Sequence, residues 1–276
     1  MKKKIAVLLS GHIRTYEMFN QVLISLINNF DKHNYDDYSF YYFLHTWSTI
    51  DPNSDTPTSY EKLKDLFNFS GVFIDEYKTF PEIQLGWEKR PELYYHEKQA
   101  YNILSMHYSI QETNDLRKNF SIENNIEFDA VIRTRPDLII CEPIDFSKVD
   151  FSKYNFPDDA FGFADWFCIA SPDLMDHYCS FLKDYDTIVP NVEHHGCFGI
   201  HKVDNHNLLL YHLLSIGHGF PINKIKELRL AVDEKHYEDE LYISKQKHDI
   251  QIVDFEYYLL RPGGKRDTFH KKYRVE

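Results

Sequence analysis

The chain has 276 residues, of which 43% are hydrophobic and 16% aromatic, so it can form a substantial core. Its formal net charge of −12 argues against a general nucleic-acid-binding protein, and we expect no nucleic-acid partner. The N-terminal apolar run ends at Ser10, too early for a signal peptide, and we expect no transmembrane segment.

The first expected unit is a strand, a loop and a helix. Residues 5–9 are apolar without alternation, which predicts a buried strand, and Thr15 can cap the helix that follows. The loop contains Gly11, which permits close backbone approach, and Arg14, which can reach a phosphate at the helix start. The alternative is an ordinary turn glycine and a surface arginine.

Strands and helices continue to alternate along the first half of the chain. The pattern predicts a strand at residues 38–44, a short helix at 60–69, a strand at 72–74 and a long helix from 95 to about 119. A further strand follows before residue 140. This order indicates an α/β fold with a mostly parallel central sheet flanked by helices.

The strand in residues 128–140 is interrupted by three charged residues, Arg133, Arg135 and Asp137, around Pro136. Proline cannot donate to a sheet ladder, so the strand must end or bulge there. Ligands bind at the carboxyl ends of strands in open α/β sheets, and two guanidinium groups with one carboxylate suit a polyanion. The alternative is an internal salt-bridge network, because structural ion pairs place charged residues together in the same way as a ligand-binding site does.

The second half has mixed character. We expect a loop at 141–159, a strand at 161–170, a helix from Ser171, a helix at 204–216, and strands at 228–232 and 250–255. Asp165 is an acid within an apolar, aromatic strand, and it is either functional or simply hydrogen-bonded at the strand end. The histidines and cysteine in residues 194–201 match no zinc template, so we expect a loop there.

Four segments together resemble a known family: SGHIRT at 10–15, FLHTW at 43–47, VIRTRPDL at 131–138 and ADWFCIAS at 164–171. They are similar to GT-A-type nucleotide-sugar glycosyltransferases that build surface glycans in bacteria and large DNA viruses, with the WavE-type lipopolysaccharide-synthesis proteins as the nearest group. The resemblance covers roughly residues 5–215. It implies one GT-A-like, Rossmann-type domain over 1–276, with a nucleotide-binding half at 1–140 and an acceptor-side half with a C-terminal extension at 141–276.

The resemblance also implies roles for individual residues. The nucleotide-binding residues would be Ser10, Gly11, His12, Arg14, His45, Trp47, Arg133 and Arg135. Asp165 would be the catalytic base for the acceptor hydroxyl if the reaction inverts. We further expect Lys98, Tyr101 and Trp166 to contact donor or acceptor, since Lys98 and Tyr101 are three apart and share a helix face.

A divalent cation is the cofactor that the resemblance implies. Residues 135–137 occupy the place of the family's acidic D-x-D, which binds the ion on the diphosphate, but Arg135 replaces the first acid. Asp137 alone would then hold Mg2+ or Mn2+, with phosphate oxygens and water completing the shell. Alternatively, Arg133 and Arg135 would neutralise the diphosphate directly.

The implied activity is transfer of a sugar from a nucleoside-diphosphate sugar, with UDP favoured, to a hydroxyl of a growing surface glycan or glycoconjugate. Two alternatives remain open at this point: a nucleotidyltransferase or other sugar-nucleotide enzyme, and a non-catalytic glycan-binding or assembly protein. The four cysteines show no C-x-x-C spacing, which favours a reduced, cytosolic-type compartment. The resemblance implies that this is the cytoplasm of a bacterium or of an infected host cell. A basic tail near residues 265–274 suits peripheral contact with a membrane.

Overall fold

The computed structural model describes residues 2–77, 97–157, 165–185, 208–209 and 212–213, with backbone alone for 97–100 and for three strands between 250 and 267. Several expectations lie outside the described residues, namely the loop at 194–201, the strand at 228–232 and most of the basic tail. Within the described part, no helix has the length and apolar character needed to cross a membrane.

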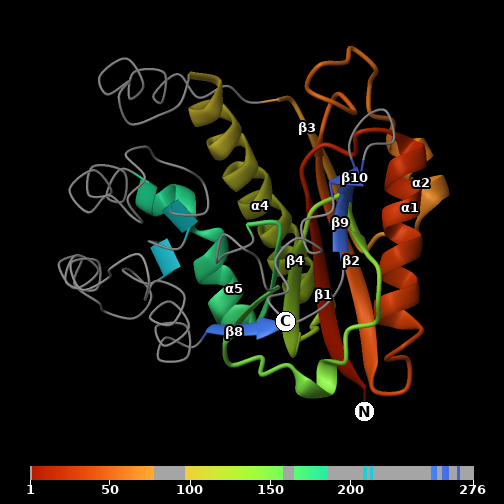
Figure 1. Cartoon of the computed structure of the whole chain (residues 1–276), viewed down its shortest axis with the longest axis vertical. Helices are drawn as coiled ribbons and strands as arrows, with labels where there is room; N and C mark the ends of the chain where they lie inside the picture. Colours follow the sequence, from red (N-terminus) through yellow and green to blue (C-terminus); the bar gives the residue numbers. More distant parts are fainter. Residues whose placement is uncertain are drawn as a thin grey trace, which may run out of the picture.

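The elements follow one another in the order shown in Figure 1. They are β1 (Lys3–Ser10), α1 (Tyr16–Leu26), the π-helix η1 (Ile27–Asp31), β2 (Tyr38–Trp47), α2 (Tyr60–Leu66), β3 (Gly71–Asp75), α4 (Glu97–Asn124), β4 (Ala130–Thr134), β5 (Leu138–Ile140), the 3-10 helix η3 (Phe146–Lys148), β6 (Tyr154–Pro157), β7 (Phe167–Ala170), α5 (Pro172–Cys179), β8 (Ile250–Val253), β9 (Tyr257–Leu260) and β10 (Arg266–Asp267).

The central sheet has seven strands in the order β3-β2-β1-β4-β7-β6-β8. Strand β1 is parallel to both β2 and β4, β2 is parallel to β3, and β6 is parallel to β8. Strand β7 is antiparallel to its neighbours β4 and β6. The expected α/β fold with a mostly parallel sheet is therefore confirmed. A second sheet of three strands, β10-β9-β5, was not expected from the sequence.

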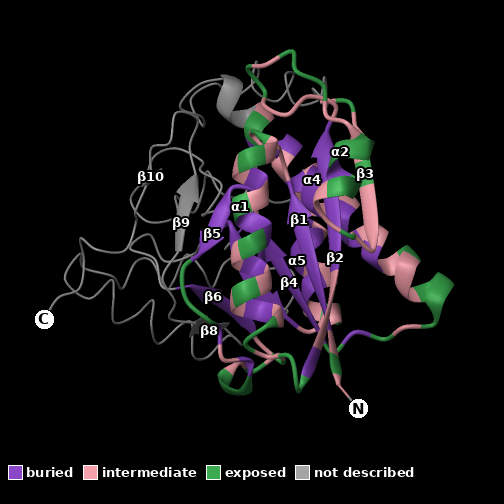
Figure 2. Cartoon of the chain, turned by 90° about the vertical axis from the view of Figure 1, so that its right-hand side faces the viewer, coloured by how far each residue is buried: buried purple, intermediate pink, exposed green. Residues whose placement is uncertain are grey.

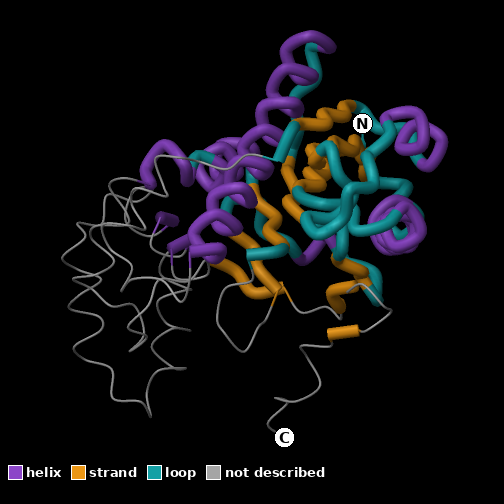
Figure 3. The backbone as a smooth tube through the Cα atoms, turned by 90° about the horizontal axis from the view of Figure 1, so that it is seen from above, coloured by secondary structure: helices purple, strands orange, loops and turns teal. Residues whose placement is uncertain are grey.

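Helices cover both faces of the central sheet, with α1 and α2 on one side and α4 and α5 on the other (Figures 1 and 3). The alternation of side chains along β1 supplies both cores. Ile5, Val7 and Leu9 pack with α1, whereas Ala6 and Leu8 pack on the α4 side. The central strands are buried along almost their whole length, as Figure 2 shows. This double burial explains why β1 is apolar without alternation.

Helix starts agree with the local sequence signals. The side chain of Thr15 accepts a hydrogen bond from the backbone N–H of Met18 at the start of α1. At α5, Ser171 is the N-cap, Pro172 occupies the first turn, and Asp173 places a negative charge near the helix N-terminus. Both helices were expected at these positions.

Two expectations in the second half need correction, and the strand after Pro136 has a partner that the sequence did not indicate. Residues 154–157, expected as loop, form β6, whose side chains are fully buried in the central sheet. Strand β7 begins at Phe167, later than expected, and Asp165 lies in a turn before it. Strand β5 begins at Leu138, two residues after Pro136, and pairs with β9 outside the central sheet. The proline explains this change, because it ends the ladder of β4.

Helices α4 and α5 are fastened to each other by polar contacts. Asp176 of α5 accepts a hydrogen bond from Arg117 Nη2 at 2.6 Å and another from Asn114 Nδ2 at 2.7 Å. Arg117 is only 4% exposed, so this carboxylate compensates a buried guanidinium. The contacts join the two helices that lie on the same face of the central sheet.

Candidate functional site

Two sequence motifs meet where β1 and β4 end. Gly11 adopts φ 124°, a conformation that favours glycine, and its N–H donates to the carbonyl oxygen of His45 at 3.1 Å. A Cβ atom added at Gly11 would lie 3.7 Å from Cδ of Pro136. The loop after β1 therefore packs against the break between β4 and β5, as expected for carboxyl ends on one edge of a parallel sheet.

Arg14 has an unusual backbone conformation for a residue that is not glycine. Its φ of 66° lies in the left-handed region, and its N–H donates to the carbonyl oxygen of Ile50 at 2.7 Å. Such conformations cost free energy and cluster at functional sites. The consequence here is that the guanidinium of Arg14 is directed toward the end of β4.

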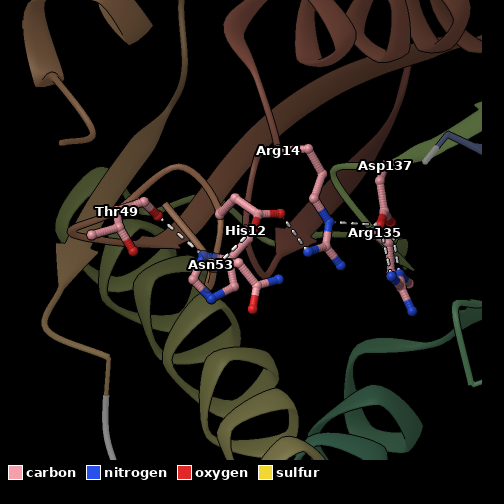
Figure 4. A network of polar contacts seen from close by, with 7 residues as sticks. His12, Arg14, Thr49, Asn53, Arg135 and Asp137 are labelled. Atoms are coloured by element: carbon pink, nitrogen blue, oxygen red, sulfur yellow. Dashed lines mark hydrogen bonds and ion pairs between the residues drawn. The ribbon is translucent and has the colours of Figure 1, made fainter. Parts of the chain in front are cut away.

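Asp137 joins two arginines, and we refer to Arg14, Asp137 and Arg135 as the Arg–Asp–Arg cluster (Figure 4). Arg135 makes a bidentate contact, with Nε to Oδ1 and Nη2 to Oδ2, both at 2.7 Å. Arg14 Nε donates to Oδ2 at 3.3 Å. The carboxylate is 1% exposed, so both guanidinium groups compensate its burial.

Asp51 completes this network, although the sequence analysis did not identify it as a site residue. Its Oδ2 accepts a hydrogen bond from Arg14 Nη1 at 3.0 Å. Burial alone would raise the pKa of Asp51, but hydrogen bonds from the Asn53 N–H and from Arg14 outweigh it and lower the pKa below its usual value. Asp51 follows β2 as Arg14 follows β1, so the shared edge of adjacent parallel strands was the available signal.

Both arginines of the cluster retain free N–H groups. Arg14 uses Nε and Nη1, and Arg135 uses Nε and Nη2, so the Nη2 group of Arg14 and the Nη1 group of Arg135 have no partner among the described residues. Their side chains are 19% and 20% exposed. A guanidinium presents five N–H donors, so each can still bind an anion while it is fixed by Asp137.

Arg133 lies apart from the cluster, on the α4 and α5 side of the sheet. It is fully buried, and its Nη1 donates to the backbone carbonyl of Asp165. Within the described part of the chain, its Nε and Nη2 atoms have no hydrogen-bond partner. Ser10 is also buried, and its hydroxyl likewise finds no partner there. The structure thus places these two predicted nucleotide-binding residues beneath the helical layer.

The backbone carbonyl of Asp165 accepts two hydrogen bonds from buried side chains. Its carbonyl oxygen accepts from Arg133 and from the hydroxyl of Tyr178, the latter at 3.4 Å. The residue is 7% exposed. Burial alone would lower the pKa of Arg135. The nearby carboxylates of Asp137 and Asp165 have the larger combined effect and raise this pKa above its usual value. Asp165 therefore lies close enough to the cluster for a favourable charge interaction.

The remaining predicted contact residues are less closely grouped. Trp166 is 5% exposed and packs in the core on the α1 side. Tyr101 lies half-buried on α4, and the side chain of Lys98 is outside the described part of the chain.

An aromatic cluster, made of His12, His45, Trp47, Tyr77 and Tyr108, borders the loop after β1. Trp47 is stacked on Tyr108 with ring centroids 5.9 Å apart, and His12 lies 5.3 Å from Tyr77. His45 Nδ1 is 2.7 Å from the hydroxyl of Ser109 on α4. Rings with polar edges can stack on a base or a sugar, and they also pack the end of β2.

Two histidines shielded from water, the half-buried His12 and the buried His212, predict that the fold is sensitive to acid. Burial lowers the pKa of both His12 and His212 to about 4 from 6.5. Below pH 6.5 these histidines bind protons in the unfolded chain but stay neutral in the folded chain until the pH approaches 4. The free energy of unfolding therefore decreases as the pH falls from 6.5 toward 4. Each histidine should lower the free energy of unfolding by about 2 kcal/mol between pH 7 and pH 5.

Urea denaturation at the two pH values measures this loss. His212→Gln should remove about half of the loss that the two histidines cause, because glutamine keeps a donor for the His177 carbonyl oxygen, which lies 2.8 Å from Nε2. The exposed His33→Gln is the matched control and should leave the pH dependence unchanged. Equal pH dependence in His212→Gln and the unchanged protein would contradict the assignment.

The residues around Asp137 do not suit a divalent cation. Both carboxylate oxygens already accept N–H groups from guanidinium ions, and the nearest other acid of the network, Asp51, also pairs with Arg14. Among the described residues, no three His, Cys, Asp or Glu side chains gather as metal ligands. A cation bound at Asp137 would face two positive charges at close range.

Neither a protein-family profile nor a curated protein sequence matches the chain. Several solved structures similar to it are glycosyltransferases. The apo-form GlyE of Streptococcus pneumoniae TIGR4 has 10% identity, a TM-score of 0.36, and covers 78% of this chain. The chain spans 43% of GlyE, less than half of its length.

Two further structures give similar values. The galactosyltransferase LgtC, in complex with donor and acceptor sugar analogs, has 9% identity and a TM-score of 0.40, over 75% of this chain and 69% of its own. Mouse xyloside xylosyltransferase 1 has 10% identity and a TM-score of 0.34, over 92% and 85%. At these values the likeness assigns neither a family nor an activity to this chain.

Proposed function

We propose that this protein is a glycosyltransferase that moves a sugar from a nucleoside-diphosphate sugar, with UDP as the favoured nucleotide, to a hydroxyl of a surface glycan or glycoconjugate. The observation that carries the proposal is the Arg–Asp–Arg cluster at the carboxyl ends of β1 and β4. It fixes two guanidinium groups and leaves N–H donors on each. Ligands of open α/β sheets bind at this edge.

The charge of the cluster suits a diphosphate. Arginine matches phosphate oxygens with planar, forked donors, and two arginines can contact both phosphate groups. The segments that resemble nucleotide-sugar glycosyltransferases contribute all three residues of the cluster as well as Asp165, which supports the proposal independently of the geometry.

The chemistry follows from the leaving group. When the bond between the anomeric carbon and the diphosphate breaks, negative charge grows on the diphosphate, and the free N–H groups of Arg14 and Arg135 would stabilise it. The anomeric carbon acquires oxocarbenium character. Asp165 interacts electrostatically with Arg135. Its carboxylate would accept the proton of the acceptor hydroxyl as the acceptor oxygen attacks the anomeric carbon.

Calorimetry with UDP, GDP, CDP and dTDP, together with nucleotide-release assays on their sugars, tests the proposal. Arg14→Ala should weaken binding of the preferred nucleoside diphosphate at least about tenfold, since a charge-assisted contact is lost. Lys148→Ala removes a cation that is 82% exposed and should leave the affinity unchanged.

The outcomes separate the candidate functions. Release of pyrophosphate from a nucleoside triphosphate would indicate a nucleotidyltransferase, and glycan binding without any nucleotide binding would indicate an assembly protein. Failure of every nucleoside diphosphate to bind would overturn the proposal.

A further inference from the structure

The Arg–Asp–Arg cluster occupies the place where the resembling family binds a metal ion on the diphosphate. We infer that this site works without a divalent cation, and that Arg14 and Arg135 bind the diphosphate in place of the ion. The inference rests on the proposed function, because it specifies how that function treats its donor. The deciding question is whether the carboxylate of Asp137 coordinates a metal ion or pairs with Arg14 and Arg135.

The geometry assigns Asp137 to the arginines. Its Oδ1 accepts Nε of Arg135 at 2.7 Å, and its Oδ2 accepts both Nη2 of Arg135 at 2.7 Å and Nε of Arg14 at 3.3 Å. Mg2+ requires oxygen ligands at about 2.0–2.1 Å in near-ideal octahedral geometry. Such an ion would have to displace at least one short, charge-assisted bond of a carboxylate that is 1% exposed.

Asp51, the second acid of the network, also has hydrogen-bond donors at both carboxylate oxygens. Asp51 Oδ2 accepts Nη1 of Arg14 at 3.0 Å, and its Oδ1 accepts the backbone N–H of Asn53 at 2.9 Å. The nearby His12 directs Nδ1 toward the carbonyl oxygen of Thr49 at 3.0 Å. Each side chain that could serve as an ion ligand in this loop therefore already has a protein partner.

The charges nevertheless sum as they would with an ion present. Two carboxylates and one divalent cation give a net charge of zero, and so do Asp51 and Asp137 with Arg14 and Arg135. The difference is that the two positive charges are distributed over planar groups that already carry unused N–H donors. Those donors can contact phosphate oxygens directly, without a metal ion between protein and ligand.

The experiment compares UDP affinity by calorimetry in EDTA and in excess Mn2+, and measures protein-bound Mn2+ by electron paramagnetic resonance. For the unchanged protein we expect affinities that agree within about twofold and no bound Mn2+ in the presence of UDP. Arg135→Asp creates an acid pair around Pro136, as in the family's D-x-D pattern, and Arg135→Asn is its uncharged match.

In EDTA, both variants should bind UDP at least about tenfold more weakly, because one phosphate-binding cation is absent. Mn2+ should restore affinity only in Arg135→Asp, which should also show bound Mn2+. If the unchanged protein loses UDP affinity in EDTA and regains it with Mn2+, the inference is overturned while the proposed function stands. If no nucleoside diphosphate binds in either condition, both are overturned.

Discussion

Asp165→Asn is expected to slow sugar transfer by about a hundred- to ten-thousand-fold and to leave nucleotide affinity and melting temperature nearly unchanged. Asparagine cannot accept the proton of an attacking hydroxyl. The fold should tolerate the change because Arg133 and Tyr178 donate to the backbone carbonyl of Asp165, which the substitution retains. Transfer rate at saturating donor, calorimetry and thermal denaturation on the same variant provide the measurement.

Asp173→Asn is the matched control for this variant. Asp173 is an exposed acid in the first turn of α5, so its replacement should leave the transfer rate unchanged and affect stability only slightly. Near-normal transfer by Asp165→Asn would remove Asp165 from the mechanism. A lowered melting temperature with a proportionate loss of folded protein would instead identify Asp165 as a structural acid.

Asp137→Asn is expected to lower the free energy of unfolding by about 3 kcal/mol and to weaken nucleotide binding. The substitution removes the carboxylate that pairs with Arg135, whose side chain is 20% exposed, and leaves Arg14 with Asp51 as its remaining carboxylate partner. An asparagine amide also directs N–H groups at one of its former donors. Urea denaturation measures the first effect, and calorimetry with UDP measures the second.

The surface pair of Asp145 and Lys148 provides the control. Their side chains are 43% and 82% exposed, so Asp145→Asn should leave the free energy of unfolding nearly unchanged. Adding Arg135→Gln to Asp137→Asn should recover part of the lost stability, because the uncompensated cation is removed with its partner. If Asp137→Asn retains full stability, the cluster does not compensate burial as described.

Local signals in the sequence predicted the parts of the fold that depend on neighbouring residues. The apolar run of β1, the cap at Thr15 and the start of α5 at Ser171 all lie where the sequence indicates. Strand β6 could not be predicted in this way, because its residues follow two turns and gain their partners from β7 and from β8, which is far away in the chain. Pairing of this kind depends on tertiary context.

The positions of the charged residues at the end of β4 also could not be predicted from local sequence signals. Arg133 and Arg135 were expected together at a ligand, and a continuous strand would place both on one face. The strand instead ends at Thr134, so Arg133 keeps its position beneath α4 and α5 while Arg135 turns toward Asp137. Asp51 was missed because its partner, Arg14, adopts a left-handed backbone that no sequence pattern specified.

Because β5 pairs with β9, we expect the candidate site to form only after the C-terminal part of the chain has been synthesised. Asp137 immediately precedes β5, and the register joins Leu138 to Leu259 across almost half of the chain. On the ribosome, β1, β2 and β4 emerge long before β9 exists, so a growing chain can hold the central strands without the partner of β5. Nucleotide capture by arrested nascent chains should therefore begin only when residues 257–260 have emerged, and capture by much shorter chains would contradict this dependence.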